Sequence, residues 1–282
     1  MCSRQGLIYA LPHCKEILRF RWQSGKYCSL IVGSNWLFDA LRRIRWSLDE
    51  KRVPIEIGAS GANVIRVRRG DRSTWIEKRG AAAEIRAEAA VLKWCADRLP
   101  VARLIEHREG VMITSELPGV TLAEVSLENA VNVLVEALDL MHALPVENCP
   151  FSASWNVRLH EAEQRIEAGL VDEADFDGEN LGRSAADILE ELKSFPPPPD
   201  VACFTHGDAC LENFLSLGGT ISGIVDMGRA GITHPAQDWA LALRSVGSRF
   251  GPNGRQMLRQ RLPIDCTNED LLRRFLLLDE CF

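Results

Sequence analysis

The chain has 282 residues, of which 46% are hydrophobic and 26% charged, and its formal net charge is −6. This length and composition predict a globular protein with one large core or two smaller lobes that share an interface. No window approaches eighteen consecutive apolar residues, which excludes a membrane-spanning helix, and the acidic balance argues against a nucleic-acid partner.

The charges are divided unevenly along the chain. Residues 1–52 carry ten Lys or Arg and four Asp or Glu, whereas the remainder is acidic. Between Glu161 and Glu191 there are eleven acids and only two arginines. Such a stretch forms either a solvated helical face or a surface for a cationic partner, and it disfavours binding to a phosphate backbone.

The nine cysteines include no C-x-x-C pair, and the N-terminal residues do not resemble a signal peptide. We therefore expect free thiols, no disulfide framework and a cytoplasmic location. Cys210, near His206, is open to two interpretations. It is either a nucleophile, whose activating base the sequence does not identify, or a small core residue.

The segment from Val53 to Gly80 predicts three antiparallel strands, because apolar and polar residues alternate at 64–68 and again at 75–78, with turn residues between the runs. Residues 81–99 follow and are rich in helix formers. They place four apolar residues on one stripe of a helix, namely Ile85, Ala89, Leu92 and Ala96.

Residues 102–119 predict two further strands, joined by a turn at Arg108-Glu109-Gly110 and ended by Pro118-Gly119. Together with the preceding elements they predict a small antiparallel sheet with one helix. We expect this part of the molecule to end near residue 116.

From residue 117 the chain is predicted to be mostly helical. Four apolar residues recur at helical spacing, Val131, Leu134, Leu138 and Met141, and acidic helical segments are expected over 158–193. Pro196–Pro199 cannot continue a helix and should form a stiff extended spacer. Gly218-Gly219 then predicts a hairpin, whose returning strand carries Asp226 toward Asp208 and Asn213.

Polar side chains therefore converge at the ends of two strands. Asn213 and Asp226 offer the oxygen ligands that hold Mg²⁺ against phosphates, and Asp208 can orient an attacking hydroxyl and accept its proton. Polar clusters also cap turns, so the three residues alone leave both interpretations open. Their combination with an upstream Gly-containing turn, a strand lysine and a helix glutamate favours phosphoryl transfer.

These residues resemble the aminoglycoside phosphotransferases, and in particular the 3′-phosphotransferase or kanamycin kinase group. The resemblance covers about residues 36–282. It rests on HGD at 206–208 with Asn213, IVDMGR at 224–229, DWAL at 238–241 with Arg244, and LLDECF at 277–282.

The resemblance implies an α+β, bilobal, protein-kinase-like fold. A nucleotide-binding lobe with a small antiparallel sheet and one helix would occupy 35–116. A larger, mostly helical lobe for catalysis and substrate binding would occupy 117–282. Residues 1–34 match nothing in the family and would be an N-terminal extension of unknown role.

The resemblance also implies roles toward ATP and Mg²⁺. Asp208 would be the catalytic base or orienter, and Asn213 and Asp226 would be the metal ligands. The nucleotide-binding residues would be Lys78, its ion-pair partner Glu88, the loop residues Gly58, Ser60 and Gly61, the hinge residues Ser115 and Leu117, and Arg229. Considered without the motifs, these positions are equally compatible with surface charges, ordinary turns and a structural ion pair.

Two local choices accompany these roles. Glu88 is preferred to Glu84 as the partner of Lys78 because EAAVLKW at 88–94 matches the family's helix. His206 has no second His or Cys at metal-binding spacing, so we expect it to support the catalytic loop, hydrogen-bonded near Asp226.

The substrate of this family is a polycationic small molecule, whose recognition requires carboxylates. The implied substrate residues are Asp172, Glu173, Asp175, Arg244, Asp279, Glu280 and the terminal carboxylate of Phe282. The apolar run 275–278 should anchor this tail, although a frayed C-terminus is the usual alternative. Leu211 stands where some members have an additional acid, which leaves the substrate range open.

Three hypotheses follow. The first is an ATP-dependent kinase of the aminoglycoside 3′-hydroxyl, a monomer or weak dimer that makes bacteria resistant. The second is a kinase of the same fold that acts on another small hydroxylated molecule, such as a macrolide, an amino alcohol or a sugar. The third is a catalytically silent nucleotide-binding protein.

Overall fold

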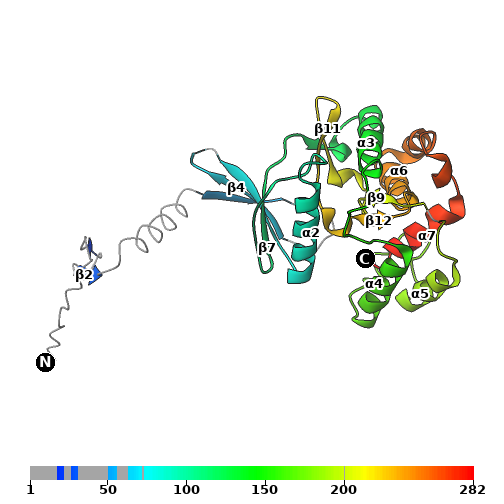
Figure 1. Ribbon diagram of the computed structural model, residues 1–282, viewed down its shortest axis with the longest axis horizontal. Helices are drawn as coiled ribbons and strands as arrows, with labels where there is room; N and C mark the ends of the chain where they lie inside the picture. The colour runs from blue at the N-terminus through cyan, green and yellow to red at the C-terminus, as the bar shows by residue number, and fades with distance from the viewer. Residues whose placement is uncertain (1–17, 22–26, 31–49, 56–62, 72, 200) are drawn as a thin grey trace. The chain divides into compact units, whose positions relative to one another are not determined.

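The computed structural model describes residues 18–21, 27–30, 50–55, 63–71, 73–199 and 201–282 (Figure 1). The chain divides into two compact units, residues 1–53 with 67–74 and residues 54–66 with 75–282. Every candidate site residue that the structure describes belongs to the second unit.

The described residues before Ser73 form short strand pairings. β1 (Leu18–Arg21) pairs antiparallel with β2 (Tyr27–Leu30). β3 (Glu50–Pro54) is hydrogen-bonded to β4 (Asn63–Arg69), and an ion pair of 3.3 Å between Arg69 and Glu50 links the two strands.

The three strands β5 (Thr74–Arg79), β7 (Val111–Ser115) and β6 (Leu104–Arg108) complete a sheet with the order β3-β4-β5-β7-β6. The pairings of β7 with β5 and with β6 are antiparallel, in agreement with the small antiparallel sheet that the sequence predicts. Gly110, at φ 66°, makes the turn between β6 and β7.

Helix α2 (Ala82–Cys95) follows β5 and packs against β6 and β7. Three of the four predicted stripe residues, Ile85, Ala89 and Leu92, are at most 3% exposed. The prediction is wrong for Ala96, which is exposed because the helix ends at Cys95 and Ala96 is its C-terminal cap.

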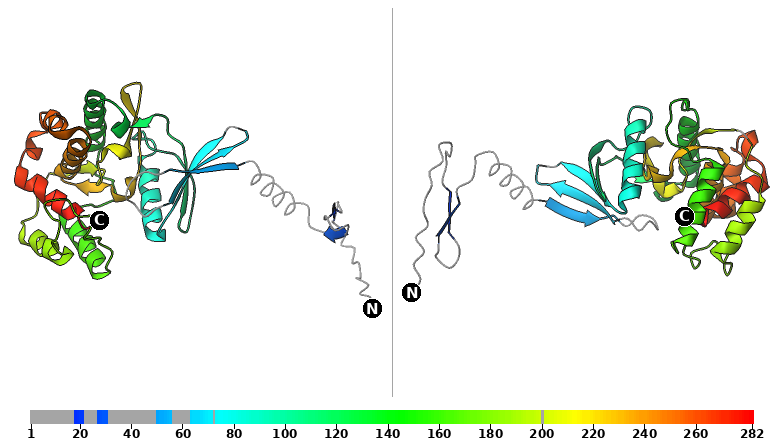
Figure 2. Two further views of the ribbon diagram at one scale, coloured as in Figure 1. Left: turned by 180° about the vertical axis from the view of Figure 1, so that it is seen from behind. Right: turned by 60° about the horizontal axis from the view of Figure 1, so that its bottom comes forward.

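The remainder of the second unit is mostly helical, as predicted (Figures 1 and 2). Its longer helices are α3 (Leu127–His142), α4 (Trp155–Glu167), α5 (Ala185–Ser194), α6 (Ala236–Arg259) and α7 (Glu269–Asp279), and its short 3-10 helices are η1 (Leu122–Glu124), η2 (Leu211–Asn213), η3 (Met227–Arg229) and η4 (Ile264–Cys266). The predicted apolar stripe of α3 is at most 1% exposed at every position.

The helical segments expected over 158–193 are present as α4 and α5, but a long stretch between them is not helical. Residues 168–184 lie between α4 and α5 and are not helical. Ala168 caps α4, and Gly169 follows at φ 66°, a conformation that ends helices readily because glycine has no Cβ. The five acids between Asp172 and Glu179 are therefore presented from a long loop.

Short strands bring the catalytic motifs together. β10 (Phe214–Leu217) pairs antiparallel with β11 (Thr220–Ile224) through the predicted turn at Gly218-Gly219, and β8 (Val120–Thr121) completes this sheet. β9 (Cys203–Thr205) pairs antiparallel with β12 (Gly231–Thr233). The chain before β9 at Phe195–Pro199 has no regular structure, in agreement with a proline spacer.

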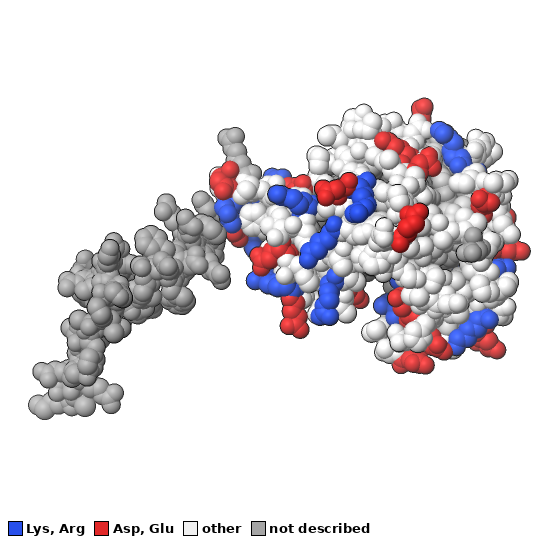
Figure 3. All heavy atoms as spheres, viewed as in Figure 1, with Lys and Arg blue, Asp and Glu red and all other residues white. Residues whose placement is uncertain are grey.

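The C-terminal helix is anchored in the core, as expected, with Phe275, Leu277 and Leu278 each 2% exposed. In the part of the chain that the structure describes, no helix is both long and apolar enough to cross a membrane. The face shown in Figure 3 mixes side chains of both charges and offers no extended basic surface.

Candidate active site

Lys78 lies in β5 and contacts two carboxylates. Its Nζ is 2.8 Å from Glu88 Oε2 and 2.7 Å from Asp226 Oδ1. The sheet and α2 determine this geometry, because α2 begins three residues after β5 and turns Glu88, but not the exposed Glu84, toward the strand. We call Lys78, Glu88 and Asp226 the lysine triad.

Burial alone would lower the pKa of Lys78, but the carboxylates of Glu88 and Asp226 outweigh it and raise the pKa above its ordinary value. The ammonium group is therefore retained although only 14% of the side chain is exposed. A fixed positive charge in a partly buried position can bind phosphate oxygens, as the lysine of kinases does.

Asp208 and Asn213 are joined directly. The Asn213 Nδ2 group donates to the backbone oxygen of Asp208 at 2.9 Å and to its carboxylate at 3.0 Å. Asn213 closes η2, which bends the chain back after the Asp208 loop. Because the amide nitrogen is used in these two bonds, the amide oxygen is left to accept a cation or another donor.

Asp226 follows β11 in a left-handed conformation with φ 55° and ψ 52°. Among the described residues it is the one non-glycine residue with a positive φ, a strained state that is common at functional sites. Its neighbour Val225 donates to the backbone oxygen of Asn213 at 2.9 Å. This bond confirms the prediction that the hairpin brings Asp226 beside the Asp208 loop.

The donor set at these residues fits Mg²⁺ bound together with a nucleotide. No group of three or more His, Cys, Asp and Glu residues within the described ranges could form a complete cage. Magnesium does not need one, since it is commonly held by one or two protein oxygens together with phosphates and water. The side-chain oxygens of Asn213 and Asp226 are of the kind that such partial coordination uses.

His206 is fully buried and links the two catalytic segments. Its Nδ1 accepts from the Asp208 N–H at 3.2 Å, so Nε2 carries the proton and donates to the Val225 carbonyl at 2.9 Å. The imidazole therefore supports the loop next to Asp226, as the sequence predicts.

A second set of charged residues lies close to the C-terminus. Asp279 accepts from Arg229 at 2.6 Å and also from Arg244, and Arg244 reaches Asp177 at 3.1 Å. Glu280 accepts from the Asp177 N–H at 3.1 Å. We call these five residues the C-terminal cluster.

Burial would raise the pKa of Asp279, but the two arginines outweigh it and hold the pKa below its ordinary range. The opposite holds for Glu280, whose pKa is raised, first by burial and then by the nearby charge of Asp177. The bonds from Asn180 and from the Asp177 N–H only partly oppose this rise. Adjacent carboxylates thus have pKa values shifted in opposite directions.

Phe282 lies among three guanidinium groups. Those of Arg229, Arg165 and Arg158 are 4.8, 5.5 and 5.7 Å from the centre of its ring. Arg165 also donates to the backbone oxygens of Cys281 at 2.8 Å and Phe282 at 3.1 Å. These contacts hold the last residues beside α4, which excludes a frayed tail.

The three predicted acids of the 168–184 loop are exposed. Asp172 accepts from the Ala174 N–H at 3.0 Å, and Glu173 accepts from the Ala185 N–H at 2.8 Å, at the start of α5. Asp175 is joined to this turn through its backbone N–H. The acid of this loop that the structure brings to Arg244 is Asp177, which was not among the residues predicted from the sequence.

A cavity of about 600 Å³ lies beside this acid. Asp177, Asn180, Arg244, Arg255 and Arg273 are among its lining residues, which come from the loop and from α6 and α7. No single motif marks these positions, because three separate segments supply them.

The expected hinge residues, Ser115 and Leu117, both lie within the described part of the chain. The Ser115 N–H donates to the Arg103 carbonyl, and its hydroxyl accepts from the Arg103 N–H at 3.0 Å. Leu117 packs against Gly223, where an added Cβ would lie 2.8 Å from its side chain. The expected loop residues Gly58, Ser60 and Gly61 lie outside the described residues.

Cys210 is part-buried, and burial raises the pKa of its thiol, with Asp208 adding to the rise. The neutral thiol favours the interpretation of Cys210 as a packing residue over that of a nucleophile.

A sequence profile described as the phosphotransferase enzyme family matches residues 51–270. An aminoglycoside 3′-phosphotransferase of Escherichia coli is 32% identical over 254 residues, which cover 84% of this chain and 90% of that relative. The chain belongs to the phosphotransferase enzyme family. A further aminoglycoside 3′-phosphotransferase, from Streptomyces fradiae, is 31% identical over 72% of this chain and 81% of its own length.

Solved structures of phosphotransferases share the fold. An aminoglycoside-3′-phosphotransferase of type VIII superposes with a TM-score of 0.75 at 30% identity, covering 88% of this chain and all of that one. An aminoglycoside phosphotransferase from Streptomyces rimosus, in complex with ADP and streptomycin, gives 0.72 at 21% identity over 87% of this chain and 97% of its own. These structures confirm the predicted α+β, kinase-like architecture.

Proposed function

We propose that the protein transfers the γ-phosphoryl group of ATP to the 3′-hydroxyl of aminoglycoside antibiotics and thereby confers resistance. The observation that carries this proposal is the meeting of two bonded pairs, Lys78 with Asp226 at 2.7 Å and Asn213 with Asp208 at 2.9–3.0 Å, whose segments are joined by the backbone bond from Val225 to Asn213. The curated relatives of this chain are named aminoglycoside 3′-phosphotransferases. Both the chemistry of the side chains and the family support the same reaction.

Lys78 holds the phosphates of the nucleotide, and Glu88 keeps its ammonium group in place. Asn213 and Asp226 would hold Mg²⁺, whose chemical contribution would be to neutralise phosphate charge. Asp208 orients the acceptor hydroxyl. As the hydroxyl oxygen forms its bond to the γ-phosphorus and the bond from that phosphorus to the ADP oxygen breaks, Asp208 takes up the hydroxyl proton.

The proposal includes a division of the chain near residue 116 into a nucleotide-binding lobe and a catalytic lobe. Residues 35–116 would bind the nucleotide, with Leu117 at the start of the catalytic part. Its backbone N–H makes no hydrogen bond within the described residues, whereas that of Ser115 is already bonded to Arg103. We therefore propose Leu117 as the donor to adenine.

The C-terminal cluster and the 168–184 loop support binding of a polyamine. Asp177 lines the cavity beside α6 and α7, and Glu280 accepts hydrogen bonds from two of its lining residues, Asp177 and Asn180. Asp172 and Asp175 belong to the same loop as Asp177. Carboxylates such as these attract ammonium groups. Arg229, Arg244 and Asp279 would hold these acids and the tail of the chain in position rather than bind the nucleotide.

The test is ADP release by purified protein with MgATP and a panel of acceptors: kanamycin, the 3′-deoxy compound tobramycin, a macrolide and choline. We expect turnover with kanamycin, none with tobramycin, and none in the Asp208→Ala variant. Turnover only with the macrolide or choline would retain the reaction and replace the substrate. Nucleotide binding without turnover of any acceptor would contradict the proposed function.

A further inference from the structure

Three arginines are among the described residues that line the cavity beside α6 and α7, although the proposed acceptor is a polycation. They are Arg244, Arg255 and Arg273, and the acids in the same lining are Asp177 and Glu179. A wall with more cations than anions does not attract a polyamine. The cavity therefore contains a feature that the acidic composition of the chain does not explain.

The three guanidinium groups differ in their partners. Arg244 is paired with Asp177 at 3.1 Å, and Arg273 is paired with Glu191 at 2.7 Å. In the part of the chain that the structure describes, Arg255 forms no ion pair, hydrogen bond or ring contact. Its charge is therefore left to act on a molecule in the cavity.

A kink in α6 brings Arg255 to this wall. Gly251 has φ 72° and ψ −168°, outside the helical region, and Pro252 follows it. The second half of the helix is redirected there, and Arg255 packs against Gly247, where an added Cβ would lie 3.5 Å from its side chain. Gly247 is three residues after Arg244, so these two positions lie on the same face of α6. Arg255 thus lines the cavity beside the turn of the helix that carries Arg244.

Paired charges connect this cavity to the catalytic aspartate. Asp279 joins Arg244 to Arg229. Burial would lower the pKa of Arg229, but Asp279 and then Asp208 raise it above its ordinary value. The Asp208 carboxylate therefore lies within electrostatic reach of this pair, and an acceptor that presents a hydroxyl to Asp208 can extend a further ring into the cavity.

A guanidinium group and an ammonium group cannot satisfy each other. Both carry a positive charge, and both donate hydrogen bonds without a lone pair to accept one. A hydroxyl group has two lone pairs and can accept from Arg255. This wall therefore favours a neutral hydroxylated group over an amine, and the repulsion between like charges is stronger in a partly enclosed cavity than in bulk water.

We propose that Arg255 is a specificity-determining residue, which disfavours acceptors whose ring in the cavity carries an ammonium group and favours those whose ring carries hydroxyls alone. The inference rests on the proposed function and narrows its substrate class. The preferred aminoglycoside carries its amines on the rings closer to Asp208. This assigns a role to a residue that belongs to none of the motifs.

The test compares two acceptors that differ at this ring. Kanamycin carries an amine on its third sugar, whereas the third sugar of ribostamycin is a neutral pentose. Arg255→Glu should raise the ratio of kcat/KM for kanamycin to that for ribostamycin by about tenfold, and Arg255→Gln should raise it by about threefold. Arg255→Lys retains the charge and should leave the ratio within about twofold of the wild type. KM for MgATP should stay unchanged in all three variants.

The matched control is Arg86→Glu, which reverses the charge of an exposed arginine on α2. It makes the same change in net charge and should not alter the ratio. Ionic strength gives a second readout. Raising it from about 0.05 to about 0.5 M should narrow the difference in this ratio between the wild type and Arg255→Glu, because screening weakens a charge effect and leaves a steric one unchanged.

The outcomes separate the two proposals. A wild type that phosphorylates neither acceptor contradicts the proposed function, and the inference falls with it. Turnover of both acceptors with one and the same ratio in the wild type, Arg255→Gln and Arg255→Glu would overturn the inference alone. A ratio in Arg255→Lys that changes as much as in Arg255→Glu would show that shape rather than charge selects the acceptor, and would overturn it as well.

Discussion

The lysine triad and the C-terminal cluster arrange their charges in opposite ways. In the triad, one cation, Lys78, lies between the carboxylates of Glu88 and Asp226. In the cluster, one anion, Asp279, lies between the guanidinium groups of Arg229 and Arg244. Each central group is favoured in its charged form by its two partners, which raise the pKa of Lys78 and lower that of Asp279.

The two sites differ in whether an acid remains exposed enough to bind a ligand. In the triad the outer acid Asp226 is 36% exposed and can still bind a cation. In the cluster, the anion is only 10% exposed and the arginines enclose it. Removing Lys78 from the triad should therefore weaken ligand binding, whereas removing the Asp279 charge from the cluster should lower the folding stability.

The largest effect is expected from Asp279→Asn. It removes the anion but leaves Arg229 and Arg244 close together in a partly buried site, so the free energy of unfolding should fall by about 3 kcal/mol, as for other broken buried ion pairs. Denaturant unfolding with two probes measures this. The control is Asp97→Asn, an exposed residue after α2, which should leave the midpoint unchanged. Equal stability of both variants would contradict the enclosed-anion description.

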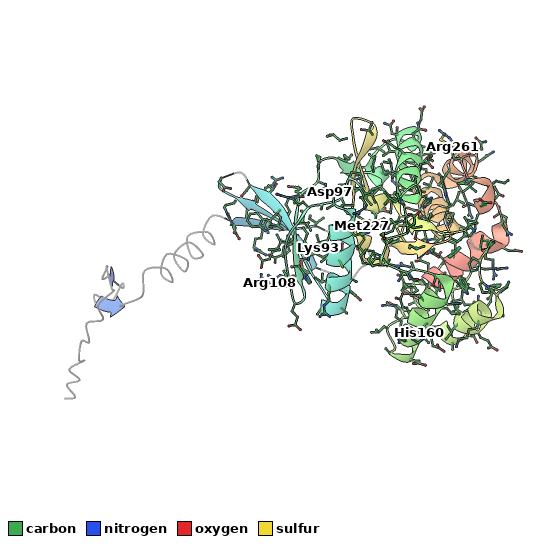
Figure 4. The ribbon with its side chains drawn as sticks, viewed as in Figure 1. Lys93, Asp97, Arg108, His160, Met227 and Arg261 are labelled. Atoms are coloured by element: carbon green, nitrogen blue, oxygen red, sulfur yellow. The ribbon has the colours of Figure 1, made fainter. Side chains whose placement is uncertain are left out.

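Lys78→Met should act mainly on activity. It removes the phosphate-binding cation and leaves Glu88 and Asp226 facing each other, so kcat/KM for MgATP should fall about a hundredfold or more, comparable to the loss of one charge-stabilising donor. Steady-state kinetics at several nucleotide concentrations provide the measurement. Lys93→Met, on the exposed face of α2 and labelled in Figure 4, is the matched control. Similar activity in both variants would exclude Lys78 from phosphate binding.

The smallest effect concerns pH. Because the folded-state pKa of Asp279 is lowered, its contribution to stability is complete above the unfolded value of about 3.9 and is lost as the pH falls through the folded value. The folded-state pKa of Glu280 is raised, so its contribution is present below about 4.3 and is lost as the pH rises through the folded value. Carboxyl carbon NMR titration should show Glu280 titrating at the higher pH. The reverse order would contradict the assigned surroundings of both groups.

The sequence predicts well what short-range patterns determine. Alternation and helical spacing predicted β5, α2 and α3, and the turn at Gly218-Gly219 placed Asp226 beside Asn213. These elements depend on neighbouring residues, so a local pattern is sufficient to identify them.

The sequence does not predict partners that come from distant segments. The sequence predicted helical segments over 158–193 but not the length of the loop between them, where Gly169 follows the end of α4 and the side chains of Asp172 and Glu173 accept backbone hydrogen bonds. Asp177 has no local signal, because its ion-pair partner Arg244 lies 67 residues further along the chain. Periodicity contains no information on such pairs.

The four residues from Asp226 to Arg229 have one end in each charged site. Asp226 contacts Lys78, and Arg229 contacts Asp279. Gly228 lies between them, and a Cβ added to it would be 3.7 Å from the Glu88 side chain. The number of residues in this segment therefore sets the spacing between the two charged sites. Inserting or deleting one residue would displace either Asp226 from Lys78 or Arg229 from Asp279. The turn at Gly218-Gly219, where an added Cβ meets nothing within 4 Å, has no such constraint. Natural and engineered changes of length should therefore be found at the hairpin tip and be absent from the 226–229 segment.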